Sequence, residues 1–170
     1  YIKNTTVQSI YVTTNASLPD RIENFSKMII SLDKNIELTF QISIDDMPQE
    51  HDRVRKIANL FEYCIDTYQR LLKIHEKVAP VISITVSHEN CDNIEKIFEY
   101  LTVKCNIKSL KCTIVRDEGV YKTPKEKKEK IARNWEASRV GDGDRFASNL
   151  ENSERPPGIK STIAPSRIVQ

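Results

Sequence analysis

The chain has 170 residues, of which 39% are hydrophobic and 29% charged, and its formal net charge at pH 7 is +2. This length is enough for one domain with a hydrophobic core. The near-neutral charge gives no reason to expect nucleic acid as a partner. No apolar run approaches the roughly 20 residues that cross a bilayer, and no signal peptide is visible. We therefore expect a cytoplasmic protein with no membrane partner.

Strand-like and helix-like segments alternate along the chain. Runs of β-branched and aromatic residues predict the strands, and apolar residues at helical spacing predict the helices. Ala79-Pro80 is expected to end the longest helix. In chain order the predicted elements are strand 8–14, helix 22–32, strand 36–44, helix 52–78, strand 81–87, helix 92–101, strand 110–115 and a helix from 123.

Four strand–helix units in strict alternation predict an α/β fold in which helices cover a parallel sheet. Near-continuous apolar strands support a parallel arrangement, because both faces of such a sheet are covered. Beyond about Arg139 the periodicity fades into Gly-Asp-Gly-Asp, Asn-rich and Pro-Pro-Gly sequence. We predict one α/β domain at 1–139 and an irregular or flexible tail at 140–170.

The four cysteines lie in or beside apolar segments and have no paired short spacing. This favours buried free thiols in a reducing compartment, with a disulfide or a metal site as the alternatives. His51 suits a helix cap or a packing position, and neither His75 nor His88 has a cysteine or histidine at ligand spacing. We expect no zinc site. Glycine-rich phosphate motifs such as G-x-G-x-x-G are absent from the sequence.

Every predicted strand ends in polar residues, and in a parallel sheet these ends form the edge at which ligands bind. Polar residues there also cap the next helix, so one such turn alone does not indicate a site. The turn after strand 36–44 is the strongest candidate, because Ser43 and Asp45 point to the same face, opposite to Ile44. Arg55 is expected in the first turn of the next helix, where the helix dipole favours an acid. A cation there indicates a ligand carboxylate or a partner acid.

Four motifs follow one another at the ends of the predicted strands and at the start of the next helix. They are Thr13-Thr14-Asn15-Ala16, Ser43-Ile44-Asp45-Asp46, His51-Asp52-Arg53-Val54-Arg55, and Ile84-Thr85-Val86 followed by Asn90. In order and in spacing they resemble motifs of the radical S-adenosylmethionine (radical SAM) enzymes, in which the first three read Thr-Asn-Gly, Ser-Leu-Asp-Gly and His-Asp-x-x-Arg. The resemblance covers about residues 8–119 and is closest to the peptide-modifying and maturase branch of that superfamily.

This resemblance implies a binding site for S-adenosylmethionine. In the family, the serine and the arginine contact the amino-acid end of the cofactor, and the arginine pairs with its carboxylate. Carried over, Ser43 and Arg55 would hold the cofactor, Asp45 would organise the site, and Asn15 would lie close by at the barrel mouth. A guanidinium–carboxylate fork suits this task because it is charge-assisted and directional. No catalytic residue is assigned.

The sequence departs from the family pattern in two ways. Ala16 and Asp46 stand where the family has glycines, so those turns must use other backbone angles or accept strain. The Cys-x-x-x-Cys-x-x-Cys loop that binds a [4Fe-4S] cluster is absent. The resemblance therefore implies a fragment with the third to sixth strand–helix units of a partial TIM-like barrel, domain 1–139. The cluster is expected in the full-length parent and not in this chain, which would be inactive alone.

Three functions are considered for this sequence. The first is a fragment of a radical SAM enzyme, whose parent would cleave S-adenosylmethionine at the cluster to generate a deoxyadenosyl radical, with a peptide as a candidate substrate. The second is a non-catalytic α/β binding or scaffold domain. The third is a barrel lyase or aldolase using Asp45 or Glu89, which would need a Schiff-base lysine that no strand end provides. The exposed first strand is expected to favour dimerisation through the sheet edge.

Overall fold

In the computed structural model, residues 6–32 and 35–114 are described. They form a four-stranded sheet in the order β1-β2-β3-β4, and all neighbouring strands are parallel. The predicted α/β fold is therefore confirmed. In chain order the elements are β1 (Ser9–Thr14), α1 (Pro19–Ile30), β2 (Glu37–Ser43), α2 (Pro48–Arg55), α3 (Leu60–Leu71), β3 (Val78–Val86), a 3₁₀ turn (Cys91–Asn93), α4 (Ile94–Glu99), a π-helical turn (Tyr100–Lys104) and β4 (Leu110–Ile114).

Some predictions fall outside the described residues. They are the end of the fourth strand at residue 115, the helix from 123 and the tail at 140–170. The domain boundary near residue 139 therefore stays a prediction.

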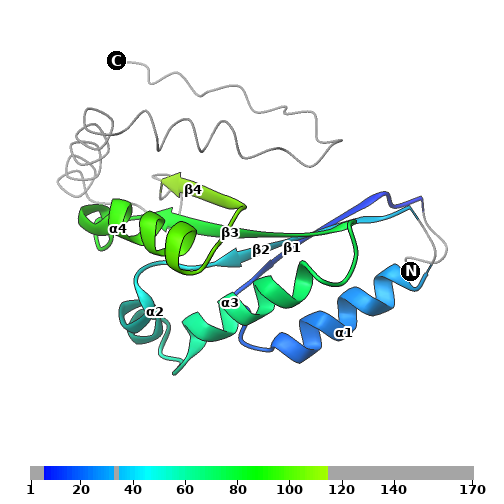
Figure 1. Ribbon diagram of the computed structural model, residues 1–170, viewed down its shortest axis with the longest axis horizontal. Helices are drawn as coiled ribbons and strands as arrows, with labels where there is room; N and C mark the ends of the chain where they lie inside the picture. Colours follow the sequence, from blue (N-terminus) through cyan, green and yellow to red (C-terminus); the bar gives the residue numbers. More distant parts are fainter. Residues whose placement is uncertain (1–5, 33–34, 115–170) are drawn as a thin grey trace, which may run out of the picture.

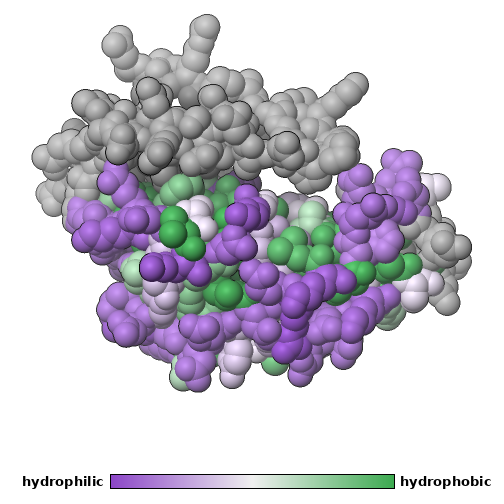
Figure 2. All heavy atoms as spheres, in the orientation of Figure 1, coloured by the Kyte–Doolittle hydropathy of each residue, from purple (hydrophilic) through white to green (hydrophobic). Residues whose placement is uncertain are grey.

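The core lies on the face of the sheet along which α1 and α3 run (Figure 1). Phe40 in the middle of β2 is 1% exposed and meets Phe25 of α1 edge to face, with ring centroids 6.4 Å apart. Its alternate neighbours Leu38 and Ile42 are also buried. In the space-filling view, hydrophilic side chains cover most of the visible helix surface, and hydrophobic ones show mainly near the level of the sheet (Figure 2).

The predicted helix over 52–78 is wrong: two helices, α2 and α3, occupy this region, and the last residue of the prediction, Val78, begins β3. Lys56 ends α2 in a left-handed conformation (φ 57°), and Asn59 precedes α3 with φ 59°. The Asp52 carboxylate then accepts a hydrogen bond from the Phe61 N–H (2.8 Å), which caps the second helix from the first. Neither left-handed residue is a glycine, so the usual local stop signal is missing.

Pro80 is not a helix stop but lies inside β3, a central strand. The Ile82 N–H donates to the Ser109 carbonyl (3.0 Å), so even-numbered N–H groups of β3 point toward β4. Pairing between β3 and β4 begins at Ile82 and Leu110. Pro80 precedes this pairing, so its missing N–H removes no ladder hydrogen bond.

The two turns in which Ala16 and Asp46 replace the family's glycines were expected to use other backbone angles or to accept strain, and each does one of these. Ala16 has φ 55° and is fully buried, so an alanine occupies a left-handed position that favours glycine. The Thr14 hydroxyl accepts a hydrogen bond from the Ala16 N–H (3.0 Å) and supports this turn. Asp46 is not among the positive-φ residues, and its carboxylate accepts the Met47 N–H (2.7 Å).

Candidate functional site at the strand ends

The structure joins two predicted site residues directly. Asp45 lies just beyond β2, and its Oδ2 is 2.5 Å from Nε of Arg55. Arg55 is the last residue of α2, because this helix begins at Pro48. The prediction that Arg55 lies in the first turn is therefore wrong, and the helix dipole favours a cation where it does lie. Of the two explanations that the sequence left open, the partner acid is present in the structure.

The backbone of Asp45 is held from two sides. Its N–H donates to Nδ1 of His51 (3.1 Å), and its carbonyl accepts a hydrogen bond from Nδ2 of Asn90 (2.6 Å). His51 is fully buried and Asn90 is 3% exposed. The predicted packing role of His51 is therefore confirmed, although the residue lies inside α2 and not at its entry.

His51 is neutral in this site. Burial lowers the pKa of its imidazole, and this outweighs the effect of the nearby Asp45 carboxylate, which raises it. Nδ1 accepts the Asp45 N–H, so the proton must sit on Nε2. The 3.9 Å between Nδ1 and the Asp45 Oδ2 therefore does not represent an ion pair.

Cys64 of α3 lies between the ends of β1 and β2. Its Sγ is 3.9 Å from Nε2 of His51, 3.4 Å from the Asn15 carbonyl oxygen and 3.8 Å from that of Ser43. Burial raises the pKa of this thiol to about 12, so it stays protonated and can donate to a carbonyl. Cys64 thus connects the backbones of both predicted strand-end residues to His51, and it is no nucleophile.

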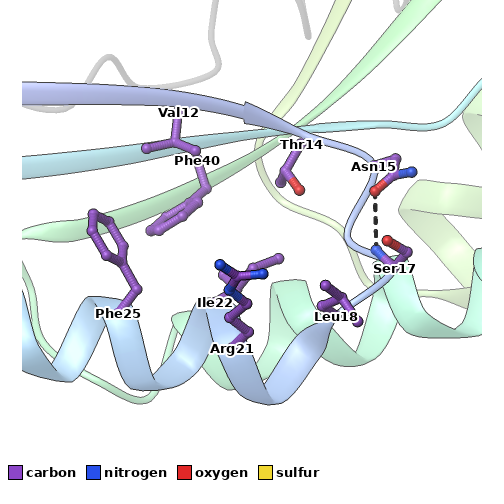
Figure 3. Close-up of a pocket in the computed structure, with 9 residues that line it drawn as sticks. All are labelled: Val12, Thr14, Asn15, Ser17, Leu18, Arg21, Ile22, Phe25 and Phe40. Atoms are coloured by element: carbon purple, nitrogen blue, oxygen red, sulfur yellow. Dashed lines mark hydrogen bonds between the residues drawn. The ribbon is translucent and has the colours of Figure 1, made fainter.

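The Asn15 side chain is half-buried, and its Oδ1 accepts the Ser17 N–H (3.2 Å) in a local turn. Asn15 also lines a pocket of about 360 Å³ beside β1, together with aromatic side chains (Figure 3). Phe40 forms part of that pocket. By strand alternation Ser43 faces the other side of the sheet from Phe40, and of the predicted cofactor-site residues only Asn15 lines this pocket.

The side of the sheet opposite to the core is mostly polar, with Ala79 and Val81 of β3 as apolar exceptions. On β2 the residues that alternate with the buried ones are half-buried and hydrophilic, and they lead up to the Asp45 carboxylate. The Tyr11 hydroxyl of β1 donates to Oε1 of Gln41 on this side. A closed barrel core would carry branched apolar residues at such positions. Polar groups instead favour contact with water or a polar ligand. The residues concerned include Tyr11, Thr13, Thr39, Gln41, Ser43, Ser83, Thr85, Lys111 and Thr113.

The described residues show no cluster of three or more His, Cys, Asp or Glu that could hold a metal ion. All four cysteines are free, as predicted, and two of them, Cys64 and Cys91, are buried. None of the helices within the described ranges is long and apolar enough to cross a membrane.

No protein-family model and no curated protein matches this sequence. Solved structures do match. One is native anSMEcpe, a radical SAM enzyme, with bound AdoMet (S-adenosylmethionine) and Kp18Cys peptide, at a TM-score of 0.54 and 17% identity. The match covers 82% of this chain and 38% of that one. A histidine-tagged form with bound AdoMet gives a TM-score of 0.53 and is covered to 36%. This chain has the fold of part of anSMEcpe.

At 17% identity the likeness to anSMEcpe shows the fold alone. It confirms the predicted part of a TIM-like barrel. The chain spans little more than a third of the length of anSMEcpe.

Proposed function

We propose that this chain contributes the AdoMet-binding strand ends of a radical SAM enzyme. The observation that carries this proposal is the Asp45–Arg55 pair at the carboxyl end of β2. The fold is shared with anSMEcpe, which has been solved with AdoMet bound. Ligands of parallel α/β folds bind at this edge, so the pair lies where a cofactor would be expected.

The charges of the pair suit the methionyl end of AdoMet, which carries an ammonium and a carboxylate. The side chains of Asp45 and Arg55 are 22% and 38% exposed, so both remain accessible. Asp45 occupies the Nε edge of the guanidinium, and the Nη nitrogens are the donors for a ligand carboxylate. Ser43 would add its hydroxyl, and Asn15 would lie at the edge of the site.

A [4Fe-4S] cluster does not fit the residues of this chain. The 170 residues contain no Cys-x-x-x-Cys-x-x-Cys sequence, and no described cysteine belongs to a group of three or more side chains that could hold a metal ion. We therefore expect the chain alone to hold no cluster and to turn over no AdoMet, while still binding it. The free cysteines also support the predicted cytoplasmic location.

Titration with AdoMet, followed by NMR chemical shifts, tests the binding. We expect shifts at Asp45 and Arg55, and an affinity at least about tenfold lower in Arg55→Ala, because a charge-assisted hydrogen-bond pair is lost. Arg53→Ala is the matched control, since Arg53 lies on the same helix and pairs with Glu50 (2.7 Å). Equal affinity in wild type and Arg55→Ala would refute the assignment. No shifts at millimolar AdoMet would favour a non-catalytic α/β binding or scaffold domain.

We further propose that the polar side of the sheet receives a peptide substrate. Its hydroxyl, amide and ammonium groups can hydrogen-bond to a peptide backbone, and anSMEcpe has been solved with peptides bound. Shifts at Tyr11 and Gln41 on adding a peptide to the AdoMet-loaded chain would support this use. Shifts confined to the opposite face would contradict it.

The outer edge of β1 pairs with no strand of the described ranges. β1 carries no charge, proline or glycine that would protect this edge, and Tyr11 on it is 56% exposed. We propose that two copies of the chain pair here. The Gln8 carbonyl accepts the Glu37 N–H, so even-numbered backbone groups of β1 face β2 and odd-numbered ones face the outer edge. Sedimentation should show a dimer that Tyr11→Pro, which removes an N–H of this outer edge, abolishes. A monomer at all concentrations would refute this pairing.

A further inference from the structure

We propose that His51 and Asn90 are positioning residues that hold Asp45 so that its carboxylate can fix the guanidinium of Arg55. The proposal rests on the AdoMet-binding function above. It assigns these two buried side chains a role in ligand affinity that acts through Asp45, without contact to the ligand.

Asp45 lies just beyond the last hydrogen bond between β2 and β3. The Ile44 N–H still donates to the Ser83 carbonyl (3.0 Å), which continues the β2–β3 ladder by one bond. One residue later, both backbone polar groups of Asp45 bind side chains, His51 at the N–H and Asn90 at the carbonyl. The position of Asp45 is therefore set by these two residues and not by a neighbouring strand.

The Asn90 amide cannot turn away from Asp45, because all of its groups are engaged. Nδ2 donates to the carbonyls of Asp45 (2.6 Å) and Thr85 (2.9 Å), and Oδ1 accepts the Ser87 N–H (2.8 Å). Two of these partners lie at the end of β3. Asn90 thus ties the end of β3 to the residue that carries the carboxylate.

His51 and Arg55 are four residues apart on α2 and share one face of this helix. His51 holds the Asp45 N–H, while Arg55 binds the Asp45 carboxylate. One face of α2 therefore contacts Asp45 twice, at its backbone through His51 and at its carboxylate through Arg55. A guanidinium held in this way loses less rotamer freedom when a ligand carboxylate binds.

Two substitutions of His51 separate positioning from packing. In His51→Asn the side-chain oxygen lies near the place of Nδ1 and can accept the Asp45 N–H. In His51→Gln the polar end lies near the place of Nε2, so that acceptor is lost. We expect His51→Gln to weaken AdoMet binding about tenfold and His51→Asn to stay near wild type. A purely structural role would lower stability in both and would not separate their affinities.

Tyr68→Phe is the control for lost stability. Tyr68 is buried, and its hydroxyl accepts the N–H groups of Lys108 (3.2 Å) and Ser109 (3.1 Å), which precede β4. This variant should unfold at lower urea and bind AdoMet like wild type. If Tyr68→Phe weakened binding as much as His51→Gln, the positioning role would be refuted.

A second readout needs no ligand. Exchange of the Arg55 Nε–H with solvent, followed by NMR, reports its bond to Asp45 directly. We expect faster exchange in His51→Gln than in His51→Asn. If His51→Gln and His51→Asn had equal exchange rates and equal affinities, the inference would be overturned. A loss of binding in Arg55→Ala would then still support the proposed function. If wild type bound no AdoMet, the proposed function would fail, and the exchange rates would still decide whether His51 positions Arg55.

Discussion

Phe40→Ala should lower the free energy of unfolding by about 4 kcal/mol, because it removes a buried aromatic ring and leaves a cavity. Phe40 lies on the second strand, opposite Val12 on one side and Pro80 on the other. Its ring also meets Phe25 edge to face. The cavity would thus open between α1 and three strands, where the surroundings have little room to collapse. Urea unfolding followed by circular dichroism measures the loss.

Met28→Ala is the matched control for Phe40→Ala. Met28 repeats at helical spacing with the apolar residues of α1, but it is 52% exposed. Its truncation should change stability by at most about 0.5 kcal/mol. A similar loss in both variants would show that the core does not lie between this face of the sheet and the helices.

Periodicity was enough to predict the strands apart from the first three residues of β3, because each β2 residue either meets the helices or faces away from them. The same alternation places Ser43 on the face opposite to Phe40 and Ile42, and β2 ends there, so the shared face of Ser43 and Asp45 stays a prediction. Spacing failed at the helix break. Asp52 lies before the apolar residues of α3 and resembles a helix start, yet it lies inside α2 and binds the Phe61 N–H across the break. A cap that acts nine residues along the chain has no local signature.

The centre of the candidate site was missed for a related reason. Cys64 contacts the carbonyl of Asn15, 49 residues away, and Asn90 binds that of Asp45, 45 residues away. Such contacts depend on how strands are ordered in the sheet, which spacing does not reveal. One signal was present: Asn90 follows a strand end in the resemblance to radical SAM enzymes. This motif indicated that Asn90 lies in a polar turn, but it did not indicate that Asn90 binds Asp45.

The Arg55 prediction shows how a wrong premise can still lead to the right partner. The helix dipole argument placed a cation at an unfavourable helix start, but α2 ends at Arg55. The dipole therefore stabilises the guanidinium where it lies. Its acid partner Asp45 was in the same set of predicted site residues. Whether this pair also binds a ligand carboxylate is decided by the AdoMet titration and not by helix electrostatics.

Asn90→Asp should destabilise the fold by about 3 kcal/mol, because it places a buried carboxylate against two carbonyl oxygens. The wild-type amide donates to the carbonyls of Asp45 and Thr85, and an ionised aspartate can donate to neither. Only the bond that Oδ1 accepts from the Ser87 N–H can remain. Asn93→Asp is the matched control, since Asn93 precedes α4 at its N-cap, where an acid is favoured.

The loss in Asn90→Asp should also depend on pH in a defined direction. Burial and the two facing carbonyls would raise the pKa of the new carboxyl in the folded state. The folded protein would then bind more protons than the unfolded chain above the ordinary aspartate pKa, so stability falls as pH rises through that range. Acidification should therefore return part of the lost stability relative to wild type, because a protonated acid regains one donor. A deficit that stays constant between about pH 4 and pH 7 would contradict the hydrogen-bond assignment of Asn90.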